Sequence, residues 1–188
     1  MDMGEFTMIE KSMTPKKASI FSYIITFTAA VLYTVIYLLR YDYGNIFVTM
    51  FKPTFLLEFF ILMVFVFLFM AAGLLVKAAI LASACENKWH GLKFKIVRGL
   101  EKPYCSALTP VKVSLYITAL LAYIILTAVL PYIIAFFAGD FMFVFASFIG
   151  VLLSGGDILM LFKLIGKNSG EYILDIDCVI FYRVYYKT

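Results

Sequence analysis

Four stretches of the chain are almost wholly apolar, and each is long enough to cross a membrane as a helix. They cover residues 18–39, 55–84, 113–138 and 141–162. A helix rises 1.5 Å per residue, so about 20 apolar residues span a hydrocarbon core of about 30 Å. The pattern therefore predicts a mostly α-helical polytopic membrane protein, with four transmembrane helices in one domain that covers residues 18–165.

Other segments carry strand signals. Residues 92–96 read Leu-Lys-Phe-Lys-Ile, a strict alternation of apolar and charged side chains, and residues 104–108 offer a partner strand. Residues 171–174 and 179–185 are rich in β-branched and aromatic residues. We expect a small cytoplasmic β element in which the tail, residues 166–188, pairs with the loop, residues 91–109. We assign residues 1–17 to a cytoplasmic N-terminal tail, and expect Pro131 to kink or end the third helix.

Composition makes the bilayer the solvent for most of the chain. Of 188 residues, 64% are hydrophobic and only 15% are charged, too few charges to cover a soluble domain of this size. The loop between the second and third spans holds Lys88, Lys93, Lys95, Arg98, Lys102 and Lys112. The positive-inside rule then predicts a multi-pass protein of the cell membrane with both termini in the cytoplasm. The net charge of +4 suits anionic lipid headgroups, and we expect no nucleic-acid partner.

Three charges interrupt the apolar stretches, at Glu58, Lys77 and Asp157. A charge at the centre of a membrane helix costs about 3 kcal/mol on insertion scales, so each needs an explanation. Glu58 and Lys77 lie near helix ends, where a side chain can reach the headgroup region. Asp157 is too short to do so. It either forms an intramembrane pair with Lys77 that locks the second helix to the fourth, or serves as a metal ligand.

The metal hypothesis rests on the end of the second apolar stretch. His90 is the only histidine, and Glu86 precedes it by four residues, on one face of a helix that we expect to continue this far. In HExxH sites, two histidines at this spacing hold zinc and the glutamate activates water. Here Asn87 stands in the place of that glutamate, and an amide is no base at neutral pH. A set of Glu86, His90 and Asp157 would accept zinc, manganese or iron.

These residues carry a family resemblance. The chain has Glu-Asn-Lys-Trp-His-Gly-Leu at residues 86–92 and Ser-Gly-Gly-Asp-Ile at residues 154–158. It also has an alternating segment at residues 94–105, Thr109-Pro110 before the third span, and Asp175 ahead of an aromatic strand. From about residue 74 to residue 186 it resembles the bacterial zincin peptidase family of small four-helix membrane proteins. The resemblance implies zinc bound by histidines and an aspartate, as in site-2-type intramembrane proteases. That role carries over to His90 and Asp157 only.

The first histidine and the glutamate of the family motif are absent, so we expect a non-catalytic member. Such a protein would bind a peptide or a membrane protein in a regulatory or immunity role, without a catalytic residue or a cofactor. One alternative is an active metallopeptidase whose metal is held by Glu86, His90 and Asp157. A second alternative is a structural or transport-accessory subunit, in which Lys77 and Asp157 form an interhelical pair.

Overall fold

The computed structural model describes residues 6–12, 15–41, 53–85, 87–97, 102–167, 171–175 and 181–187. Its four long apolar helices confirm the predicted mostly α-helical, polytopic fold. The first, second and fourth are α1 (Pro15–Arg40), α3 (Phe55–Ala84) and α6 (Phe141–Leu164). The third consists of α4 (Val113–Ile124), a π-helical turn η2 (Ile125–Val129) and α5 (Leu130–Ala138).

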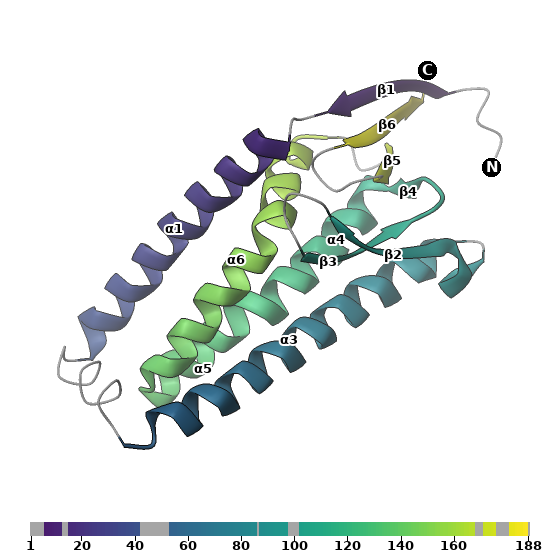
Figure 1. The fold of residues 1–188 in the computed structure, drawn as a ribbon. Coiled ribbons are helices and arrows are strands. Elements are labelled where there is room, and N and C mark those ends of the chain that lie inside the picture. Colours follow the sequence, from purple (N-terminus) through teal and green to yellow (C-terminus); the bar gives the residue numbers. More distant parts are fainter. Residues whose placement is uncertain are drawn as a thin grey trace.

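Helix α6 forms the centre of the bundle and packs against α1, α3, α4 and α5 (Figure 1). In its most apolar window 61% of the residues are buried, against 11% for α1 and 17% for α3. The two outer helices therefore present most of their apolar surface outward, as helices do when lipid surrounds them. We call the end of the bundle that carries the strands the strand end, and the other the far end.

Small residues bring α6 close to its neighbours. Pro131 has no N–H to donate to the carbonyl of Thr127, its partner in a regular α-helix, and the π-helical turn η2 lies just before it. Gly150 of α6 packs against this carbonyl, because a β-carbon at position 150 would overlap the carbonyl oxygen. Pro131 therefore does not end the helix, which continues as α5 to Ala138. The irregular turn instead becomes a contact between helices.

The contact between α1 and α6 depends on a second glycine. A β-carbon at Gly155 would overlap the hydroxyl of Ser22 on α1. Ser22 itself is buried, and its carbonyl accepts a hydrogen bond of 2.8 Å from Thr26. The two helices approach this closely because neither places a large side chain at the crossing.

Tyrosines hold the far end together. Tyr37 donates to the carbonyl of Gly139 at 2.7 Å, and Tyr41 donates to the carbonyl of Phe136 at 2.8 Å. Gly139 ends α5 in the left-handed conformation, with φ of 70°. Asp140 then caps α6, because its carboxylate accepts the N–H of Met142 at 2.9 Å. Gly139 and Asp140 thus form the turn between α5 and α6.

Strands form two separate sheets at the strand end (Figure 1). One is antiparallel in the order β1 (Phe6–Ser12), β6 (Phe181–Lys187), β5 (Tyr172–Asp175) and β4 (Val111–Lys112). The other is the hairpin of β2 (Leu92–Val97) and β3 (Lys102–Ala107).

Two expectations about these strands need correction. The tail strands pair with β4 and with β1, not with the strands of the loop, because β4 lies at the start of α4 and reaches β5 directly. Residues 6–12, for which we expected no strand when we assigned residues 1–17 to a tail, form β1, whose backbone pairs along the whole of β6. The alternation at residues 92–96 and its pairing with the segment around residues 104–107 are confirmed.

The glycine contacts lead to a prediction about packing. Gly150→Ala should lower the melting temperature of the purified protein more than Gly155→Ala, because a backbone carbonyl cannot rotate away as a serine hydroxyl can. Overpacking of this kind costs about 1–3 kcal/mol. Adding Ser22→Ala should partly restore the melting temperature of the Gly155→Ala protein but not that of the Gly150→Ala protein. Equal melting temperatures for the two glycine variants would contradict this account.

Candidate functional site

Two opposite charges meet inside the bundle. Lys77 lies on α3 and Asp157 on α6, and each is about 1% exposed. The Lys77 Nζ lies 2.6 Å from the Asp157 Oδ1. From the starts of α3 and α6, Lys77 is about 33 Å along its helix and Asp157 about 24 Å, so both belong to the strand-end half of the bundle. This is the intramembrane pair considered above, and it joins the second helix to the fourth.

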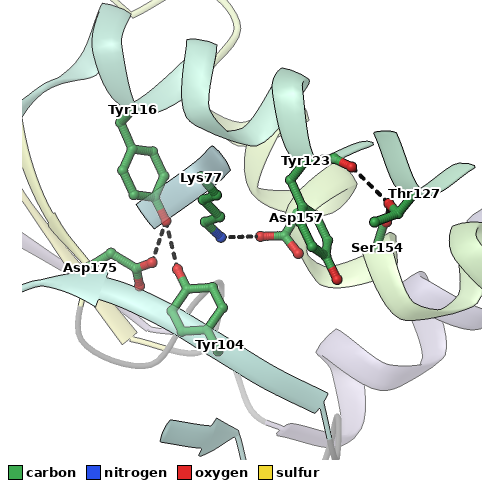
Figure 2. A network of polar contacts seen from close by, with 8 residues as sticks. All are labelled: Lys77, Tyr104, Tyr116, Tyr123, Thr127, Ser154, Asp157 and Asp175. Carbon is green, nitrogen blue, oxygen red and sulfur yellow. Dashed lines mark hydrogen bonds and ion pairs between the residues drawn. The ribbon is translucent and has the colours of Figure 1, made fainter. Parts of the chain in front are cut away.

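Aromatic rings cover the ammonium group. The ring centre of Tyr104, on β3, lies 4.2 Å from the Lys77 Nζ, and that of Tyr123, on α4, lies at 5.7 Å. The negative face of an aromatic ring attracts a cation, and more strongly where water is excluded. The ammonium therefore has a carboxylate and a ring face in place of its hydration shell (Figure 2).

A second group of hydrogen bonds continues from this ring toward the sheet. The hydroxyls of Tyr104 and Tyr116 lie 2.7 Å apart, and Tyr116 donates to the carboxylate of Asp175. All three residues are buried, and they come from β3, α4 and β5. Buried polar groups of this kind fix the relative positions of the elements that carry them. The network thus ties the hairpin and the four-stranded sheet to the helices (Figure 2).

Hydroxyl groups form further polar contacts deeper inside the bundle. Ser154 lies one turn before Asp157 on the same face of α6, and its hydroxyl is 2.8 Å from that of Thr127 in the π-helical turn. Thr127 also bonds to the carbonyl of Tyr123 at 2.8 Å, and Ser147 donates to the carbonyl of Ala128. Such bonds satisfy backbone carbonyls that an irregular turn would otherwise leave bare in an apolar environment.

The structure separates the predicted metal ligands. Helix α3 ends at Ala84 and Cys85 is extended, with ψ of 133°, so the helix does not continue to His90 as we expected. His90 lies in a short 3-10 turn, η1 (Lys88–Gly91), with its side chain exposed, whereas Asp157 is buried against Lys77. Glu86 lies outside the described residues. Within the described ranges, no group of three or more histidine, cysteine, aspartate or glutamate side chains is placed to hold a metal.

The early end of α3 has a local cause. The chain folds back on Cys85, whose thiol lies 3.7 Å from the carbonyl oxygen of Gly91. A β-carbon at Gly91 would lie 2.7 Å from that of Cys85, so only glycine allows this approach. Lys88, at the start of the turn, has a left-handed backbone with φ of 47°. The tight turn thus replaces the helical spacing on which an HExxH-type site depends.

Sequence reasoning found the two charges because each interrupts an apolar stretch. It did not find Tyr104, Tyr116 or Tyr123. Tyr116 and Tyr123 are seven residues apart and share one face of α4, which is a weak signal of a polar stripe in an apolar helix. Tyr104 had no such signal, because its role depends on how the hairpin packs against α3.

No protein-family model, no curated protein and no solved structure matches this chain. The resemblance to zincin peptidases therefore stays a prediction that rests on the residues quoted for it.

The ion pair gives a prediction about stability. Lys77→Met and Asp157→Leu should each destabilise the protein by about 3–5 kcal/mol, because each leaves one charge buried without its partner. The double variant should recover most of this loss, since it buries no charge. Thermal unfolding in detergent measures all three, with the exposed Lys112→Met as a control that should match the wild type. Additive losses in the double variant would contradict the pairing.

The cysteines beside the site give a second prediction. Burial raises the pKa of the Cys105 thiol to about 11, although the charge of Lys77 acts in the opposite direction. A thiol with a raised pKa stays protonated, and therefore unreactive, at neutral pH. Cys85 is buried as well, so its thiol is shielded from reagents by the protein. In a Cys178→Ser background, which removes the third cysteine of the chain, we expect maleimide to leave Cys85 and Cys105 unlabelled at pH 7.5 until the protein is denatured. An added Asn87→Cys, on the exposed turn, should label at once; rapid native labelling of Cys105 would contradict its burial.

Proposed function

We propose that this chain is a non-catalytic, multi-pass protein of the cell membrane, which binds a membrane protein or a peptide in a regulatory or immunity-type role. The observation that supports it is the 2.6 Å contact between the Lys77 ammonium and the Asp157 carboxylate. A metal at Asp157 would have to displace a buried ammonium. Leaving that ammonium unpaired costs several kcal/mol, so the lysine competes directly with any metal for the carboxylate.

The orientation is part of the proposal. The described lysines of the strand end include Lys88, Lys93, Lys95, Lys112, Lys163 and Lys167. Basic residues next to membrane helices stay on the cytoplasmic side. The strand end, together with both chain termini, is therefore proposed to face the cytoplasm.

The partner-binding surface is proposed on the outer helices. Phe27 of α1 is 71% exposed and Phe60 of α3 is 68% exposed, and both helices turn most of their apolar side chains away from the bundle. Apolar side chains of this kind suit lipid as well as another transmembrane helix. A partner inside the membrane would contact this surface while the buried ion pair holds the bundle rigid behind it.

Metal analysis tests the non-catalytic reading. Protein purified from zinc-, manganese- and iron-replete cultures should carry far less than one metal per chain by elemental analysis. His90→Ala and Asp157→Asn should leave that content unchanged, as should Asp140→Asn, a control carboxylate at the far end. About one metal per chain, lost in both site variants and kept in the control, would overturn the proposal in favour of a metallopeptidase with a substituted site.

A structural or transport-accessory subunit would use the same ion pair. The identity of the bound partner therefore distinguishes such a subunit from a regulatory protein. A photo-reactive residue in place of Phe27 or Phe60 should cross-link a neighbouring membrane protein or peptide in intact membranes. We expect that cross-link to persist in His90→Ala. A constant-stoichiometry complex with a transporter would instead identify an accessory subunit.

A further inference from the structure

The β2–β3 hairpin exposes large apolar side chains beside α3. Phe94 is 53% exposed and Ile96 is 71% exposed, although both belong to a strand that packs beside a helix. Alternate residues of a strand face opposite sides, so Phe94 and Ile96 share one face while Lys93 and Lys95 share the other. Figure 1 shows the hairpin lying along the strand-end part of α3, and β3 contacts that helix.

The apolar face borders a hollow of about 260 Å³. Its lining consists of Leu74, Phe94, Lys95, Ile96, Pro103 and Tyr104. The next residue of α3, Leu75, does not line the hollow but is 58% exposed and belongs to the outward apolar surface of the helix. A lipid chain that lies along this part of α3 would contact Leu75 and the apolar side chains that line the hollow.

The depth of the hollow suits the edge of a hydrocarbon core. Leu74 follows Phe55, the first residue of α3, by nineteen residues, which correspond to about 29 Å of helix. A bilayer core is about 30 Å thick. With Phe55 near one boundary, Leu74 and the hairpin lie at the other, where acyl chains give way to phosphate groups.

The opposite face of the hairpin carries positive charge. A second hollow, of about 210 Å³, is lined by Lys93, Lys95, Ser106, Ala107, Leu108, Leu174 and Asp175. The carboxylate of Asp175 already accepts a hydrogen bond from Tyr116. Among the described residues of this lining, two ammonium groups and one carboxylate give a formal net charge of +1. Lys95 lines both hollows, so the apolar and the basic surfaces meet at one side chain.

We infer that the β2–β3 hairpin is a lipid-binding element that lies in the membrane interface and holds an anionic phospholipid. The acyl chain occupies the hollow beside Leu74, Phe94 and Ile96, and Lys93 and Lys95 bind the phosphate. A soluble strand would present Phe94 and Ile96 to water, which is unfavourable for two large neighbouring apolar side chains.

The depth of the hairpin can be measured with tryptophan, because Trp89 is the only one in the chain. In a Trp89→Phe background, Phe94→Trp and Ile96→Trp place single reporters on the apolar face. In vesicles of acyl-brominated phosphatidylcholine, emission from both should fall by roughly half relative to unbrominated lipid, because the indoles contact chains at the edge of the ~30 Å core. Asn87→Trp, on the exposed turn, is the control and should respond mainly to aqueous iodide. Iodide quenching without bromolipid quenching at positions 94 and 96 would overturn the inference.

The headgroup is tested by thermal unfolding of the detergent-purified protein with added lipid. Phosphatidylglycerol should raise the melting temperature by roughly 3 °C more than phosphatidylcholine, the effect of a ligand that binds the folded state alone. Lys93→Gln with Lys95→Gln should abolish this difference, whereas Lys112→Gln, a matched exposed lysine, should keep it. If the difference between the two lipids also disappeared in Lys112→Gln, it would reflect the overall positive charge and not a site at Lys93 and Lys95. Equal stabilisation by inorganic phosphate would show a site for free phosphate; either result overturns the inference.

Discussion

The rest of the structure depends on the buried contact between Lys77 and Asp157. Each charge alone would be expensive because both groups are buried away from water, and the attraction between them offsets that cost only where the geometry is good and the remaining surface of each group is covered. Here the Nζ–Oδ1 distance is 2.6 Å and the ring of Tyr104 lies over the ammonium. Because Tyr104 belongs to β3, the hairpin takes part in the environment that makes the ion pair tolerable.

A membrane bundle cannot rely on the hydrophobic effect to hold its helices together, since lipid is as apolar as the side chains. Close packing and polar contacts between helices must do so. This chain uses an irregular turn for that purpose. The turn before Pro131 presents the Thr127 carbonyl to Gly150, and the Thr127 hydroxyl meets that of Ser154. The same face of α6 then carries Asp157, so packing contacts and the ion pair follow one line along the central helix.

Sequence patterns were sufficient to predict the four membrane-spanning helices, because the length and hydropathy of a segment are local properties. The hairpin could also be predicted, since strict alternation in residues 92–96 has no helical reading. The order of the strands could not be predicted in this way. Paired residues of β1 and β6 are 169 to 181 positions apart in the chain, and such pairing depends on where the helices place the chain ends. The end of α3 was missed for a related reason. Nothing between Ala84 and Lys88 is a strong helix breaker, and the turn follows from the close approach of Gly91 to Cys85.

The ion pair could be predicted as one of two explanations of Asp157, because a charge in an apolar stretch needs a partner. The aromatic ring over the ammonium could not be predicted, because a turn and a strand separate Tyr104 from Lys77 in the chain. The ring of Tyr104 links the buried ion pair to the hollow beside the hairpin. Tyr104 lies over the Lys77 ammonium, and the same residue lines the hollow beside Leu74. A lipid chain in that hollow would therefore contact Tyr104, the residue that shields the ion pair. One aromatic side chain would then lie between the lipid and the buried ion pair.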